Sequence, residues 1–214
     1  MLGITPATLI SRVIILVIAF TLHEYAHARL ADAFGDPTPR EAGQLTLNPL
    51  VHLDPVGTLL LILLGFGWAK PTPINPEILR RRSPAAVMLV SVAGPLTNLV
   101  LAALVGLVFR LGLVRYTGAT GNIMPTLSEF LVEFVYINVA LFLFNILPLA
   151  PLDGEKVLEY LLPSQWEGAI EDIRRFGPLL LLFLVFVGPL FGFDLFGTII
   201  QRPLNAITSF FIGV

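Results

Sequence analysis

Long apolar runs separated by short polar stretches dominate the hydrophobic pattern of the chain. The runs cover residues 4–30, 84–109, 127–147, 176–187 and 193–214, the last of them interrupted by Gly and Pro. A helix needs about 20 predominantly apolar residues to cross a bilayer. The pattern therefore predicts an all-α, multi-span membrane protein with about five transmembrane helices.

Two shorter segments do not fit this scheme. Residues 56–66 are apolar but too few to cross a bilayer, so we expect a re-entrant or interfacial segment there. The polar stretch before it contains an alternation of polar and apolar residues over 44–47, ended by Asn48–Pro49. This alternation favours a short β-strand after the first span.

Composition supports a membrane location. Hydrophobic residues make up 56% of the 214 residues and charged residues only 13%, whereas soluble domains carry about a quarter charged residues. The net charge of −2 does not point to a nucleic-acid partner, so the lipid bilayer is the expected environment. Because the chain has no cysteine, any metal ion must be held by His, Asp or Glu.

Basic residues predict the orientation. If residues 56–66 return to the side from which they enter, the loops at 29–55, 67–83 and 150–175 share one face and carry most of the Lys and Arg residues of the loops. The opposite face carries only Arg110 and Arg115. Since cytoplasmic loops are enriched in Lys and Arg, the N-terminus is expected outside the cell membrane.

Three polar residues, His23, Glu24 and His27, lie in the later half of the first apolar run. Two histidines four residues apart project from one face of a helix and can bind one metal ion, with the glutamate close enough to transfer a proton. Ionisable residues inside a membrane span are costly unless they have a function. We therefore expect one Zn²⁺ per chain, held by His23 and His27, with Glu24 as the catalytic acid/base.

Catalytic zinc usually has three protein ligands, so one more is needed. Asp153 follows a span that ends on the same side of the membrane as the two histidines, which makes it the candidate. The alternative for Asp153 is an ordinary Asp-Gly turn after a Pro-rich helix end. The matched depth and the absence of cysteine favour the ligand.

Further polar residues have two interpretations each. Asn145 could donate a hydrogen bond to a developing oxyanion, or bond to a neighbouring helix as Asn138 could. Asn98 has the same two interpretations, and we favour packing because it belongs to a stripe with Gly94, Ala102 and Gly106. His52 is either a pH-sensitive or substrate-contacting residue or a solvated loop histidine.

The motifs, taken in order, resemble those of the site-2 protease family of intramembrane zinc metalloproteases. They are the His23–His27 segment in a first span, Gly94-Pro-Leu-Thr-Asn98 in a middle one, and the segment from Asn145 to Gly154. The similarity covers about residues 8–160 and is closest to compact prokaryotic members, in which the segment 48–58 is also typical. There is no inserted PDZ or nucleotide-sensing domain.

By this resemblance, His23, His27 and Asp153 would bind zinc, Glu24 would be the acid/base and Asn145 would support the oxyanion. We expect a single membrane domain over 1–214, with a catalytic core at 8–160 and C-terminal membrane helices at 176–214. It would hydrolyse peptide bonds in or near transmembrane segments of membrane-protein substrates. The alternatives are a metal-binding transporter, for which the sequence shows no convincing internal repeat, and a catalytically inactive scaffold.

Overall fold

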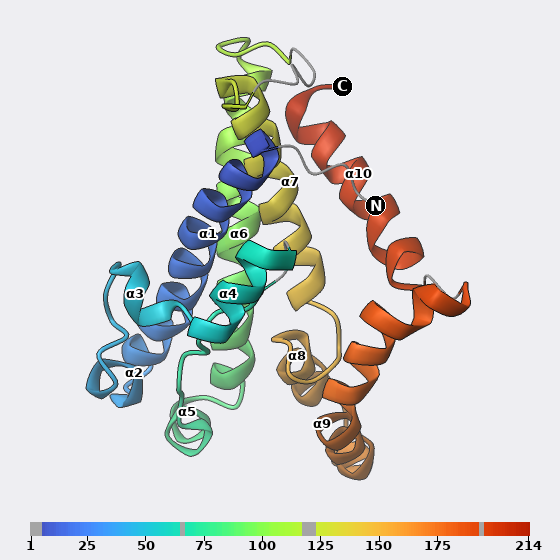
Figure 1. Cartoon of the computed structure of the whole chain (residues 1–214). Helices are drawn as coiled ribbons and strands as arrows, with labels where there is room; N and C mark the ends of the chain where they lie inside the picture. Colours follow the sequence, from blue (N-terminus) through green and yellow to red (C-terminus); the bar gives the residue numbers. More distant parts are fainter. Residues whose placement is uncertain (1–5, 65–66, 117–122, 193–194) are drawn as a thin grey trace.

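The computed structural model describes residues 6–64, 67–116, 123–192 and 195–214, which are mostly helical (Figure 1). The ends of three predicted segments, at 4–5, 65–66 and 193–194, lie outside the described residues. Within these described ranges, three helices are long and apolar enough to cross a membrane: α1 (Pro6–Ala33), α6 (Ala86–Arg110) and α7 (Leu127–Asn145).

The described residues therefore support three spans and not the five that the apolar runs predict. In the fourth run, α9 (Glu167–Leu182) has only 16 residues, and its first half is rich in charge. In the fifth, α10 (Leu195–Ile212) carries Gln201, Arg202 and Pro203 at its centre. Polar and charged groups at the centre of a helix reduce the free energy gained by placing that helix in the bilayer.

The three long helices form a bundle in which α6 packs against both α1 and α7. Ile15 and Leu16 of α1 contact Phe134 and Ile137 of α7 in one apolar cluster. Arg12, awkward inside an apolar run, pairs with Glu133 of α7 at 2.5 Å. This ion pair gives the arginine the carboxylate partner that burial in a membrane requires.

The stripe of small residues on α6 is buried as expected, and it brings other helices close. A Cβ on Gly106 would lie 2.7 Å from Cβ of Phe211, so α10 lies directly against the α6 backbone. Ile200, Leu204 and Ile212 of α10 join the apolar cluster around Ala102. The C-terminal helix is thus part of the bundle at one end (Figure 1).

Short helices occupy the polar stretches between α1 and α6. They are α2 (Thr38–Glu41), α3 (Pro49–His52), α4 (Pro55–Leu64) and α5 (Pro76–Arg82). The 10 residues of α4 extend about 15 Å, which is too short to cross a bilayer. This length agrees with the expectation that residues 56–66 do not form a span.

The strand predicted at 44–47 is absent, so that prediction is wrong. Gly43 has a positive φ of 71°, and the N–H of Gln44 donates to the carbonyl of Pro39. The segment after it bends, and Nε2 of His52 donates to the carbonyl of Thr46 at 2.8 Å. Local turns therefore occupy backbone N–H and C=O groups that a β-strand would need for pairing with a neighbouring strand. In the described part of the chain, the isolated β-bridge joins Leu53 to Ala69.

Beyond α7, a Pro-rich turn leads to α8 (Gly154–Leu161), a 3₁₀ turn at Ser164–Trp166, and α9. A π-helical turn (Phe183–Val187) and a 3₁₀ turn (Gly188–Phe191) then lead towards α10. Glu155 of α8 is 1% exposed and accepts hydrogen bonds of 2.8 Å from Lys156 and from Arg174 of α9. These ion pairs fix α8, whose first turn follows Asp153.

Candidate metal centre

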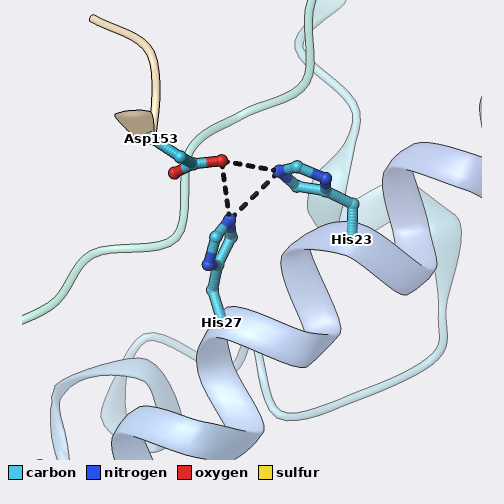
Figure 2. Close-up of side chains that lie close together, drawn as sticks. All are labelled: His23, His27 and Asp153. Carbon is cyan, nitrogen blue, oxygen red and sulfur yellow. Dashed lines mark hydrogen bonds and ion pairs between the residues drawn. The ribbon is translucent and has the colours of Figure 1, made fainter. Parts of the chain in front are cut away.

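His23, His27 and Asp153 meet in the interior of the protein (Figure 2). The two Nε2 atoms lie 3.0 Å apart, and Oδ2 of Asp153 is 3.2 Å from that of His23 and 3.3 Å from that of His27. Both histidines are buried on one face of α1, and Asp153 precedes α8. Three potential ligand atoms from two distant segments therefore converge on one point.

Hydrogen bonds behind the histidines fix which nitrogen of each ring carries the proton. Nδ1 of His27 lies 2.7 Å from the carbonyl of Val90, which can only accept, so Nδ1 donates. Nδ1 of His23 lies 2.6 Å from Oδ1 of Asn98, whose Nδ2 donates to Asn138. Asn138 in turn donates to the carbonyl of Phe134, which sets the orientation of both amides.

It follows that each neutral imidazole directs the lone pair of Nε2 towards Asp153. Nδ1 hydrogen bonds of this kind are the usual support for histidines that bind a metal through Nε2. Two lone pairs and a carboxylate this close repel one another, and a divalent cation would neutralise them. The donor set thus fits zinc.

Gly94 of α6 leaves space beside the Nε2 atoms of the two histidines. A Cβ at this position would contact Nε2 of both histidines, at 2.5 Å from that of His23. Any side chain here would occupy the space between the ligand atoms. The helix can approach the centre this closely only because residue 94 is glycine.

A cavity of about 380 Å³ opens beside the three ligand atoms. Glu24, Asn145 and Thr72 line it together with the metal-centre residues, and Phe20, Leu141 and Phe144 add apolar surface. Glu24 is buried, and its Oε2 accepts a hydrogen bond of 2.8 Å from the N–H of Thr72. A candidate acid/base, a candidate metal centre and an amide donor therefore share one cavity.

Residues 11–187 match the model of peptidase family M50. The chain belongs to peptidase family M50. This membership confirms the predicted relationship to the site-2 protease family, because M50 is the family of these intramembrane zinc peptidases. It does not favour the transporter and inactive-scaffold alternatives.

Curated relatives agree with the M50 assignment. The chain is 43% identical over 180 residues to "Putative zinc metalloprotease YwhC" of Bacillus subtilis, covering 83% of this chain and 80% of that protein. It is 34% identical over 187 residues to "Putative zinc metalloprotease Rip2" of Mycolicibacterium smegmatis, covering 81% and 67%. The Mycobacterium tuberculosis protein of the same name is 30% identical over 187 residues, covering 86% and 69%. No solved structure matches the chain.

In this M50 peptidase the five site residues expected from sequence all border one cavity: His23, Glu24, His27, Asn145 and Asp153. His52 is placed elsewhere. It is fully buried, bonds to the carbonyl of Thr46 and does not line the cavity, so the structure supports neither a solvated nor a substrate-contacting histidine.

Three contributors to the site were not expected in these roles. Asn98 does bridge helices, as packing predicts, but it also supports His23. Gly94 precedes Asn98 by one helical turn. Their spacing within the small-residue stripe was the sequence feature that could have indicated that both face the histidines. Thr72 had no signal, because its contact with Glu24 depends on how a loop folds back over α1.

Proposed function

We propose that the chain is the peptidase that uses His23, His27 and Asp153 as zinc ligands and Glu24 as acid/base to cleave peptide bonds in or beside transmembrane segments. The observation that carries this proposal is the convergence of three potential ligand atoms beside a buried glutamate in one cavity. Substrates are accordingly membrane proteins, and one metal ion per chain is sufficient.

When bound, zinc lowers the pKa of water to about 7 and polarises the carbonyl that is attacked. Glu24 takes the proton from the attacking water and delivers it to the leaving amine. Asn145 lines the same cavity, and one N–H of its amide donates to the carbonyl of Leu141 at 3.0 Å. Its second N–H is the proposed donor to the oxyanion.

A substrate helix hides its carbonyls in internal hydrogen bonds, so it must unwind before one of them reaches the centre. Three parts of the cavity wall provide polar groups that an unwound substrate segment can contact. They are α1, the loop before α5 and the turn before α8. The apolar residues Phe20, Leu141 and Phe144 accommodate its side chains. The cavity therefore suits a locally extended stretch of a membrane segment.

The metal requirement can be tested with purified protein and a model transmembrane substrate in proteoliposomes. Treatment with 1,10-phenanthroline is expected to abolish cleavage, and one equivalent of Zn²⁺ per chain to restore it, because the attacking water needs the metal to lose its proton near pH 7. Metal analysis before and after treatment measures occupancy. Cleavage that continues at full rate after complete metal removal would contradict the proposal.

We also propose that residues 1–214 form one domain, with the N-terminus outside and the centre near the cytoplasmic side. Supporting this orientation, the triple arginine of α5 and the basic residues of α8 and α9 lie towards one end of the bundle, and Arg110 ends α6 at the other (Figure 1). Membrane proteins of this kind expose their basic loops to the cytoplasm.

The orientation is testable because the chain has no cysteine of its own. Ser164→Cys is placed on the exposed turn before α9 and Leu113→Cys on the exposed turn after α6. In intact cells a membrane-impermeant maleimide is expected to label Leu113→Cys alone, and Ser164→Cys only after permeabilisation. The reverse pattern would overturn the orientation and leave the proposed chemistry unaffected.

A further inference from the structure

Two hydrogen bonds attach Thr72 to the proposed acid/base. The backbone N–H of Thr72 donates to Oε2 of Glu24 at 2.8 Å, and its Oγ1 donates to the backbone carbonyl of Glu24 at 3.1 Å. The two residues are 48 positions apart in sequence. Thr72 therefore holds both the side chain and the backbone of the same residue.

The residues on either side make this donor unusually well defined. Thr72 lies between Pro71 and Pro73, neither of which has an N–H. The following proline restricts Thr72 to extended conformations. The segment 71–73 therefore offers a single backbone donor, held in a narrow range of orientations, and that donor is directed at Glu24.

Both ends of this loop are anchored. Before Thr72, the N–H of Lys70 donates to the carbonyl of His52 at 2.8 Å, next to the bridge between Leu53 and Ala69. After it, the N–H of Asn75 donates at 2.6 Å to Asp36, which is fully buried. Because the loop is tied on both sides, the amide of Thr72 does not depend on Glu24 for its position.

We infer that Thr72 is a positioning residue for peptide hydrolysis, which fixes the carboxylate of Glu24 through its backbone N–H. The bond occupies Oε2 and leaves Oε1 as the oxygen that exchanges protons with water and the leaving amine. An N–H to a carboxylate is a charge-assisted hydrogen bond and restrains the rotation of the side chain. The inference rests on the proposed role of Glu24 and adds which group orients it.

Three substitutions separate the two hydrogen bonds. Thr72→Ser keeps both, Thr72→Val keeps the N–H and removes the hydroxyl, and Thr72→Pro removes both the N–H and the hydroxyl. The valine variant, which lacks the hydroxyl but keeps the N–H, is the reference that isolates the contribution of the amide. The proline variant is expected to lower kcat on the order of 10- to 100-fold, as misplacement of a catalytic group does, with KM and zinc content unchanged.

A second measurement does not depend on the proline variant folding. Since Pro71 and Pro73 carry no amide, hydrogen–deuterium exchange within 71–73 reports the N–H of Thr72 alone. Its exchange is expected to be slow in wild type and at least 10-fold faster in Glu24→Ala, while the amides of Lys70 and Asn75 remain unchanged.

Equal exchange of the Thr72 amide in wild type and Glu24→Ala would overturn the inference. So would a zinc-loaded Thr72→Pro with wild-type kcat, or a loss of kcat matched by loss of zinc, which would indicate a purely structural loop. These results are distinct from failure of the proposed function, which would appear as metal-independent cleavage by the wild-type protein.

Discussion

Glu24→Gln is expected to lower kcat by about 10²- to 10⁴-fold, the range that general acid–base catalysis supplies, and to retain one zinc ion per chain. Glutamine has the shape of glutamate, and its carbonyl can still accept the hydrogen bond from Thr72. It cannot take a proton from water. Cleavage of a transmembrane substrate and metal analysis on the same preparation test both halves of this expectation.

Glu77→Gln provides the matched control. Glu77 is an exposed glutamate in the first turn of α5 and does not line the cavity. The same chemical change there is expected to leave kcat and zinc content unaltered. Wild-type activity in Glu24→Gln would remove Glu24 from the mechanism, and loss of zinc from that variant would instead make it a metal ligand.

The second large effect is expected from the smallest substitution, Gly94→Ala. The added methyl group would fall between Nε2 of His23 and Nε2 of His27, where their lone pairs converge. Either α6 or the histidines must move to accommodate it. We expect zinc affinity to fall by more than the roughly 10- to 100-fold that follows loss of a residue supporting a ligand, and cleavage to be lost with it.

Gly106→Ala is the control for helix packing alone. It lies on the same stripe of α6, and its methyl group would meet Cβ of Phe211 at 2.7 Å, remote from the metal centre. We expect it to lower thermal stability and retain zinc. If Gly94→Ala and Gly106→Ala have the same zinc affinity in a titration, residue 94 does not determine access to the ligands.

Sequence reasoning predicts a metal centre at His23 and His27 because most of the information for these two residues is local. The four-residue spacing of His23 and His27 fixes their common face in any α-helix. Asp153 is far away in sequence, but the alternation of spans and the position of basic loops predict that it lies on the matching side. The structure brings its carboxylate within 3.3 Å of both rings.

Other features depend on tertiary packing and could not be deduced in this way. The alternation at 44–47 satisfies a strand pattern, yet Gly43 and His52 direct its backbone into turns. Asn98 reaches His23 only because α6 and α1 pack in one particular register. The hydrogen bonds from Thr72 to Glu24 need a loop anchored at both ends, and no periodicity in the sequence predicts such a loop.

The chain of side-chain amides behind His23 also affects how the bundle assembles. Asn98 and Asn138 are fully buried, and each is satisfied only by a partner on a neighbouring helix or by the carbonyl of Phe134. Sliding α7 by one turn would break the bond from Nδ2 of Asn98 to Oδ1 of Asn138, and unpaired polar groups in hydrocarbon cost several kcal/mol. Buried asparagines fix the register of coiled coils in the same way. Helix alignment and the orientation of His23, a proposed metal ligand, are therefore established together, so a mispaired bundle would also disrupt the proposed site.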